Sequence, residues 1–420
     1  MKKFNPCLAA GLLLTFLLSG CFKDHITHTY RLSTPVYKSL NSVRADMKSS
    51  APIAFTTTGK ISVLGNYIFL SEVGRGIHVI DNTNQSSPKN LAYISVPGNE
   101  DIAIKDNMLY ADSYSDLVVL DISDPKNIKP KKFVDNVFPD HGGYSATMSK
   151  DSVMILVDWV TKDTTVDYDP TSPQIYMVPN CASCQYMSSY VAMASAAPNK
   201  AVNGSMARFA VVNDYLYTVS YQNLNVFNVS VSDDPTFKNS STLGWGVETI
   251  YPFGNWLFIG SNNGVFMYDI SANPEIPKSV GQFAHARSCD PVITDGTHAF
   301  VTLSDGTKCQ GFENQMDIVD VSKLAYGNSA LMKTYPLTHP LGLSKDGNTL
   351  FVCDGADGLK VFDASDVMNL KMIQHFIDTK TFDIVAMNGI AIVVGSDGIY
   401  EYDYTDLSNI HFLSKLSESN

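Results

Sequence analysis

The chain has 420 residues and a formal net charge of −12, from 42 acidic and 30 basic side chains. Such an acidic chain lacks the clustered Lys and Arg on which phosphate-backbone binding depends, so nucleic acid is excluded as a partner. Hydrophobic residues make up 45% of the sequence, including 21 Tyr and 21 Phe, which is ample for a packed core.

The first 20 residues have the form of a secretory signal peptide. Lys2 and Lys3 precede an apolar run from Leu8 to Leu18, which is about half the roughly 20 residues that a membrane-spanning helix needs. The run ends in Leu-Ser-Gly-Cys at 18–21, which resembles the bacterial lipobox. The resemblance implies acylation of Cys21, a palmitate-type membrane anchor, and a place in the outer membrane or at the cell surface, with the periplasmic face as the alternative. An ordinary signal peptide with an incidental cysteine is the competing interpretation.

Residues 21–58 are expected to form an extended N-terminal linker, and a repeat begins at 59. Its marker is an apolar alternating run that ends in Asp or Asn, followed two residues later by Ser or Thr, as in GIHVID at 76–81. Neighbouring markers lie 40 to 51 residues apart, except for one interval of 107. The marker positions are Asp81, Asp121, Asn228, Asp269, Asp320, Asp363 and Asp403.

A second strand precedes each marker and begins after a short turn, as in GNYIFLSE at 65–72 and DGNTLFVCD at 346–354. The Asn-Gly, Asp-Gly and Gly-Asn pairs in these turns supply the positive φ that tight hairpins require. The marker Asp is expected to accept backbone N–H bonds in an Asx-turn where its strand ends. Each unit is therefore predicted to hold four antiparallel strands, the size of one propeller blade.

The predicted fold is all-β, a β-propeller over residues 59–420. The long interval can hold one more unit, because a degenerate copy, TTVD, ends at Asp167. Eight blades are favoured on this count, and seven is the alternative if that stretch is a long loop. The strand LVVLD at 117–121 and MDIVD at 316–320 resemble the LVIVD-repeat family. That resemblance implies a propeller in the cell envelope and carries no established common activity.

Two segments interrupt the repeat, an insertion at about 168–206 and the stretch 306–315. The first contains Cys181 and Cys184, for which a local disulfide is favoured over a metal or redox role in an exported protein. Cys289 and Cys309 are expected on one face of one unit, where a bridge would close about 20 residues and contribute on the order of 3 kcal/mol. Cys353, inside an apolar strand, is predicted to be a buried free thiol.

Alignment of the starts of the first strands gives a polar set at the mouth of the predicted channel. These residues face a side of the propeller that carries both insertions, and binding residues concentrate on loops held by rigid scaffolds. They hydrate the channel or anchor backbone in one interpretation, and form a ligand site in the other. The candidate ligand-binding residues are Asp101, His141, Arg208, Glu248, Asp290 and Asp383.

No nucleophile with an adjacent base and no metal-ligand spacing stands out, so we expect no cofactor and no metal. Binding of a glycan or an envelope protein by a monomer is the favoured function. The alternative is a glycan-active envelope hydrolase that uses paired carboxylates at the channel mouth, such as Asp290 and Asp383.

Overall fold

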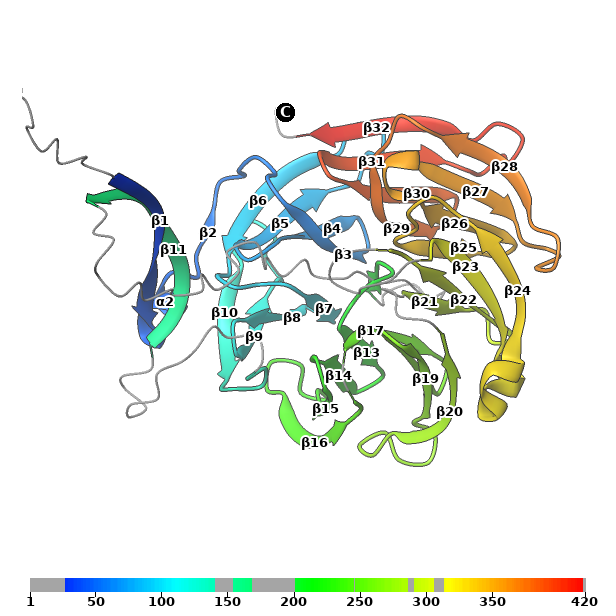
Figure 1. The fold of residues 1–420 in the computed structure, drawn as a ribbon, viewed down its shortest axis with the longest axis horizontal. Coiled ribbons are helices and arrows are strands. Elements are labelled where there is room, and N and C mark those ends of the chain that lie inside the picture. Colours follow the sequence, from blue (N-terminus) through cyan, green and yellow to red (C-terminus); the bar gives the residue numbers. More distant parts are fainter. Residues whose placement is uncertain are drawn as a thin grey trace, which may run out of the picture. The chain divides into compact units, whose positions relative to one another are not determined.

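A computed structural model describes residues 27–139, 154–167, 201–244, 246–285, 291–305 and 313–417. Within these ranges the chain forms seven antiparallel blades, each built on four consecutive strands, and the first blade carries two further short strands, one at each edge (Figure 1). The first strands of the sheets contact one another in a closed cycle, and the other strands extend outward. The all-β propeller predicted from the repeat is therefore confirmed.

The first three blades hold the N-terminal half of the ring. Their strands are β3 (Thr58–Leu64), β4 (Tyr67–Glu72), β5 (Gly76–Asp81) and β6 (Lys89–Ser95); β7 (Ile102–Lys105), β8 (Met108–Ser113), β9 (Asp116–Asp121) and β10 (Lys129–Val134); β13 (Phe209–Val212), β14 (Tyr215–Val219), β15 (Asn223–Asn228) and β16 (Thr236–Thr242).

Four further blades complete the ring. Their strands are β17 (Val247–Phe253), β18 (Trp256–Ser261), β19 (Gly264–Asp269) and β20 (Lys278–Ala284); β21 (Val292–Thr294), β22 (His298–Leu303), β23 (Gln315–Asp320) and β24 (Leu331–Pro336); β25 (Leu343–Asp346), β26 (Thr349–Cys353), β27 (Leu359–Asp363) and β28 (Lys371–Phe376); β29 (Thr381–Met387), β30 (Ile390–Gly395), β31 (Gly398–Asp403) and β32 (His411–Ser417). Two 3-10 helices, η2 (Val321–Ala330) and η3 (Gly355–Asp357), lie in connections of the fifth and sixth blades.

The ring has seven blades, so the preference for eight was wrong. The degenerate copy ending at Asp167 belongs to β11 (Met154–Asp167), which pairs with β1 (Thr27–Ser39) in a separate two-stranded sheet. β11 is one continuous strand of 14 residues without a Gly-Asn or Asn-Gly pair, so it contains no tight turn at which a blade hairpin would form. The missing turn was visible in the sequence.

The segment predicted as a linker before residue 59 carries secondary structure. β1 is followed by the short helix α2 (Leu40–Ala45), whose first turn is capped by the Ser39 hydroxyl, which accepts a bond from the Ser42 backbone N–H. β2 (Ser49–Ser50) then pairs with β6 as an outer fifth strand of the first blade.

Both predicted turn types are present. The hairpins between first and second strands carry positive φ, for example 57° at Gly65, 53° at Asn213 and 54° at Gly347. At the end of every third strand the marker side chain accepts the N–H of the residue two positions later, with N···O distances of 2.8 to 3.0 Å. The repeated Asp or Asn is therefore a structural residue, as expected.

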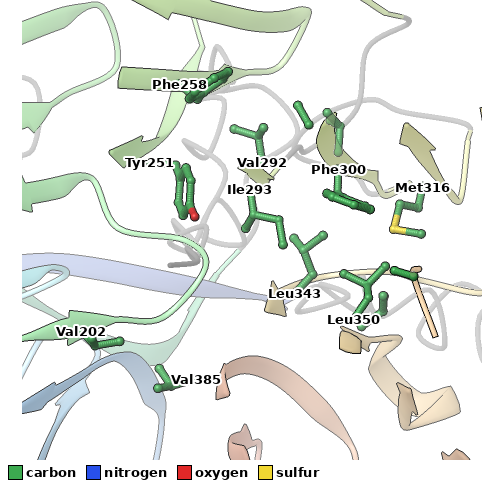
Figure 2. Packing of buried hydrophobic residues seen from close by; sticks show 14 of the residues in the cluster. Val202, Tyr251, Phe258, Val292, Ile293, Phe300, Met316, Leu343, Leu350 and Val385 are labelled. Atoms are coloured by element: carbon green, nitrogen blue, oxygen red, sulfur yellow. The ribbon is translucent and has the colours of Figure 1, made fainter. Parts of the chain in front are cut away.

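Blades pack through aliphatic and aromatic side chains that meet across sheet boundaries. Figure 2 shows Tyr251, Phe300, Leu343 and Val385, which come from four different blades and belong to one buried cluster. Tyrosine hydroxyls add specific bonds, since Tyr110 donates to the Ser232 carbonyl across a blade boundary at 2.8 Å. Tyr217 and Tyr335 make equivalent bonds to Pro274 and Val367.

The last blade closes on the first without exchanging a strand. The Thr58 hydroxyl donates to the Gly395 carbonyl at 2.8 Å, and the Asn82 side-chain amide donates to Glu401 Oε2 at 3.1 Å. Among the described strands, none from one end of the chain is inserted in the blade of the other, so closure depends on such contacts and on apolar packing.

Cys353 is buried and free, as predicted, and burial raises the pKa of its thiol well above the usual value. The other cysteines named above, Cys21, Cys181, Cys184, Cys289 and Cys309, lie outside the described residues, and their roles stay predictions. Among the residues that the structure describes, no helix is both long and apolar enough to cross a bilayer.

Ring closure should depend on pH through Glu401. Burial raises the pKa of this carboxyl to about 7, against an ordinary 4.5, so the folded protein binds a proton that the unfolded chain releases. The free energy of unfolding should therefore fall as pH rises from about 5 to about 8, by roughly 1–3 kcal/mol. Glu401→Gln should lose much less stability over that window in urea unfolding. An equal pH dependence of stability in the wild-type protein and in Glu401→Gln would contradict the role of Glu401.

Candidate functional site

The centre of the ring is occupied by residues 201–208, here called the central segment. Its β12 (Val202–Asn203) pairs antiparallel with β3, placing Val202 opposite Val63 and Asn203 opposite Ser62. The Gly204 N–H then donates to the Ile61 carbonyl at 2.9 Å. β12 is thus an extra innermost strand of the first blade.

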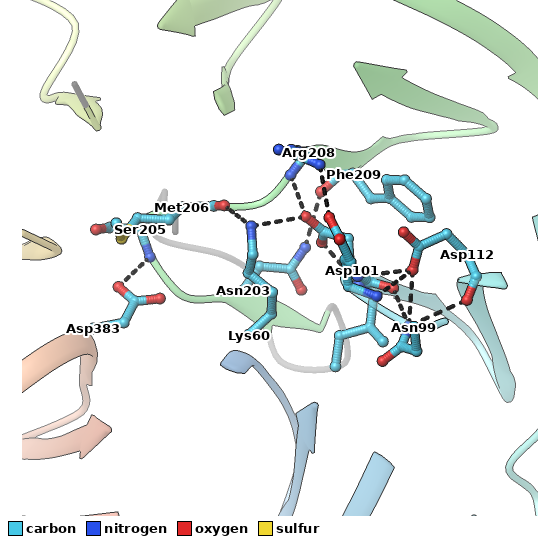
Figure 3. A network of polar contacts seen from close by, with 12 residues as sticks. Lys60, Asn99, Asp101, Asp112, Asn203, Ser205, Met206, Arg208, Phe209 and Asp383 are labelled. Carbon is cyan, nitrogen blue, oxygen red and sulfur yellow. Dashed lines mark hydrogen bonds and ion pairs between the residues drawn. The ribbon is translucent and has the colours of Figure 1, made fainter. Parts of the chain in front are cut away.

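The central segment also bonds to four other blades. The Ser205 N–H donates to Asp383 Oδ1 at 2.8 Å, and the Leu343 N–H donates to the Ser205 hydroxyl at 2.7 Å. The Ala207 carbonyl accepts from Ile250 N–H at 2.8 Å, and the Arg208 N–H donates to Asp101 Oδ2 at 2.6 Å. Eight residues therefore link the first, second, fourth, sixth and seventh blades, and Figure 3 shows the contacts around Ser205 and Arg208.

Lys60 on β3 is the cation of this network. Its ammonium group contacts Asp101 Oδ2 at 3.0 Å and also donates to the Met206 carbonyl, and its side chain is 3% exposed (Figure 3). Charged side chains are almost never fully buried unless they are paired. Lys60 thus joins the first blade, the second blade and the central segment through one group.

The charges of the network are strongly affected by burial. Removal from water lowers the pKa of Lys60 and raises the pKa of Asp101, and their mutual attraction opposes both shifts. Burial raises the pKa of Asp383 well above its ordinary value. Within the described part of the chain, Asp383 Oδ2 has no hydrogen-bond partner, which fits a neutral carboxylic acid at this position.

Asp112, at the end of β8, fixes the loop that carries Asp101. Its Oδ1 accepts bonds from the Asn99 side-chain amide and from the backbone N–H groups of Glu100 and Asp101, at 2.7 to 2.9 Å. Three donors on one carboxylate oxygen compensate for its burial. The position of Asp101 is thereby set from the second blade alone.

Three of the six predicted binding residues meet in this network. Asp101 and Asp383 are 0% and 1% exposed and bind the chain's own backbone, whereas the Arg208 side chain, 17% exposed, pairs with Glu100 at 3.0 Å. Glu248 lies on the innermost strand β17 and is partly buried. His141 and Asp290 lie outside the described residues. A ligand role for any of the six stays a prediction.

The sequence analysis missed Lys60, Ser205 and Asp112. Lys60 lies in the apolar strand TGKISVL. A lysine in the first strand of a blade could have indicated a buried ion pair at the centre of the ring. Ser205 falls within the predicted insertion, which no repeat pattern could place. Asp112 lies in a strand in which polar and apolar residues alternate, so its polarity alone did not indicate a role in the site.

Glycines make room for the Asp383 carboxylate. A Cβ atom at Gly204 would lie 2.3 Å from Asp383 Oδ2, and one at Gly342 would lie 2.4 Å from Asp383 Oδ1. Both distances are too short for non-bonded atoms, so these positions require glycine while the central segment stays in place.

The face formed by the connections from second to third strands and from fourth to first strands is here called the loop-bearing face. Tyr114 on this face has φ of 52°, a conformation that L-residues other than Asn and Asp rarely adopt. A Cβ at Gly98 would meet the Tyr114 ring at 2.7 Å, so the ring lies directly against that backbone. Tyr221, in the equivalent connection of the third blade, is 47% exposed.

Ser304, His339 and Asp305 lie together on this face, but they do not have the geometry of a catalytic Ser-His-Asp triad. The Ser304 hydroxyl lies 3.3 Å from His339 Nδ1, and Asp305 Oδ1 lies 2.9 Å from the same nitrogen. A triad needs the nucleophile and the carboxylate on different ring nitrogens. Over the described ranges, no group of three or more His, Cys, Asp or Glu is arranged to hold a metal ion.

Comparisons with known proteins agree with this architecture. The LVIVD repeat model matches residues 57–94 and 98–135, which span the first and second blades. A comparison with curated proteins finds no match.

Among solved structures, the periplasmic gluconolactonase PpgL of Pseudomonas aeruginosa superposes with a TM-score of 0.52 at 14% identity, covering 85% of this chain and 96% of that one. The computationally designed protein Ika8 gives a TM-score of 0.50 at 9% identity, covering 88% and 92%. BamB from Moraxella catarrhalis gives 0.46 at 9% identity, covering 88% and 97%. The first two likenesses concern the fold alone.

Lys60 should be essential for stability because its removal leaves the Asp101 carboxyl buried without its cation. Lys60→Met should lower the free energy of unfolding by about 3–5 kcal/mol. Adding Asp101→Asn should restore part of this loss, since a neutral amide needs no counter-charge. Urea unfolding of the two variants measures both effects. A loss below about 1 kcal/mol for Lys60→Met would contradict the assignment.

Proposed function

We propose that this LVIVD-repeat β-propeller is a lipid-anchored protein of the bacterial cell envelope that binds a glycan or protein ligand on its loop-bearing face. The observation that carries the proposal is the central segment. Its backbone N–H groups donate to Asp101 and Asp383, and its Ser205 hydroxyl accepts from the Leu343 N–H, so the centre of the ring serves to hold the blades together. Ligand contact is therefore assigned to the side chains around the centre that remain accessible.

The residues favoured for contact are Arg208, Glu100, Tyr114 and Tyr221. The Arg208–Glu100 pair is partly exposed, and either member can exchange its partner for a polar group of a ligand. The positive φ of Tyr114 is backbone strain of the kind that clusters at binding sites. Tyrosine combines a flat apolar ring with a hydroxyl, which suits both sugar faces and protein surfaces.

The opposite face is better suited to a scaffold role. Its third-to-fourth-strand connections begin with the same Asx-turn in all seven blades, and its first-to-second-strand hairpins have two- or three-residue turns made of Gly, Asn, Asp and Thr. Apart from η2 in the fifth blade, these turns are short and similar, so they offer little distinctive surface. Binding residues are instead expected where the connections differ from blade to blade.

The binding assignment is tested by capture of glycans and envelope proteins with the protein, followed by affinity measurements on variants. Tyr221→Ala and Arg208→Gln should each weaken binding of the captured ligand by about 1–3 kcal/mol. The control variants Asn255→Asp and Asn348→Asp, in exposed turns of the opposite face, should change it by less than about 0.5 kcal/mol. Unchanged binding in the first pair together with loss in the second would reverse the assignment.

The anchor is tested separately by metabolic labelling with palmitate. Label should enter the wild-type protein and be absent from Cys21→Ala, because thioether attachment needs that sulfur. The matched control Cys7→Ala changes a cysteine in the signal peptide and should leave labelling unchanged. Equal labelling of wild type and Cys21→Ala would contradict lipid anchoring at this residue.

A further inference from the structure

The two-stranded sheet of β1 and β11 has one polar face. Across the strands, the hydroxyls of Thr29 and Thr165 lie 2.9 Å apart, and Arg31 Nε donates to Asp163 Oδ1 at 3.3 Å. The Ser33 hydroxyl lies 3.4 Å from that of Thr161. Odd-numbered residues of both strands therefore point to the same side, here called the odd face.

The other side of this sheet carries three large, exposed apolar side chains together with Lys162. Because side chains alternate along a strand, the even-numbered residues point away from the odd face. Tyr30, Leu32 and Val160 are among them, and they are 48%, 56% and 55% exposed. Trp159, 51% exposed, is odd-numbered and belongs to the odd face. Large apolar side chains gathered on one face of a sheet mark an interaction surface.

The position of this sheet in the chain indicates what covers the even face. β1 begins at Thr27, six residues after Cys21, and six extended residues span at most about 20 Å. An acyl group on Cys21 would hold that cysteine at the bilayer surface, so the start of β1 cannot move far from lipid. The even face supplies Tyr30, and Tyr is enriched at membrane–water interfaces, where one end of the side chain is apolar and the other is wet.

We propose that the even face of the β1–β11 sheet lies on the surface of the lipid bilayer in which the protein is anchored. Tyr30, Leu32 and Val160 enter the interfacial region, and the Arg31–Asp163 and Thr29–Thr165 pairs of the odd face remain in water. A two-stranded sheet is at best marginally stable alone in water, and contact with lipid supplies the burial that it lacks. This inference rests on the proposed acylation of Cys21.

The test is site-specific photocrosslinking in the acylated full-length protein. Leu32→p-benzoylphenylalanine places the probe on the even face, and Ser33→p-benzoylphenylalanine is the matched control on the odd face of the same strand. The proteins are reconstituted into vesicles of phosphatidylethanolamine and phosphatidylglycerol and irradiated. Lipid adducts, detected by mass spectrometry, should be several-fold more abundant at position 32 than at position 33.

Each other outcome has a defined meaning. Equal lipid adducts at both positions, or none at either, would overturn the placement of the sheet. Crosslinks from position 32 to a second copy of the protein would overturn it in favour of self-association. Flotation with the vesicles is recorded in parallel, because failure of the wild-type protein to float would count against lipid anchoring itself, independently of the adducts.

Discussion

The buried contact of Lys60 with Asp101 and the Met206 carbonyl is the interaction on which the rest of the propeller depends. Among the described strands, the last blade contains no strand from the N-terminal end and the first blade none from the C-terminal end, so closure rests on contacts between blades. The central segment bonds to five blades, and Lys60 fixes its position. The same network underlies the proposed function, because it uses the innermost polar groups internally and the proposal therefore assigns recognition to the loops.

The architecture was predictable because each blade repeats the same two kinds of turn, a tight hairpin turn and an Asx-turn. The tight turn at Gly65, which has positive φ, and the Asx-turn at Asp121 each involve only a few residues, so the spacing of such turns predicted the strands. The spacing of these turns did not determine the number of blades. TTVD, which ends at Asp167, resembles the end of a third strand, but no hairpin turn lies within β11. The pairing of β11 with β1 joins residues more than 120 positions apart, which no local pattern encodes.

The candidate site was predictable in part. Alignment of first-strand starts correctly brought Asp101, Arg208 and Asp383 to one place, because equivalent positions of a ring converge at its axis. Their partners were not predictable, since Ser205 and the Met206 carbonyl arrive from the end of an insertion that has no repeat register. The interpretation that these residues anchor neighbouring backbone, weighed against ligand contact, describes what Asp101 and Asp383 do in this structure.

The most direct test of the central claim is hydrogen exchange at the backbone amides of Ser205 and Arg208. Both donate to buried carboxylates, so we predict that they exchange as slowly as amides in the middle of blade strands, such as that of Val119. Exchange as fast as in exposed connections would show that the central segment does not stay in the ring. Such a result would contradict its role in holding the blades together.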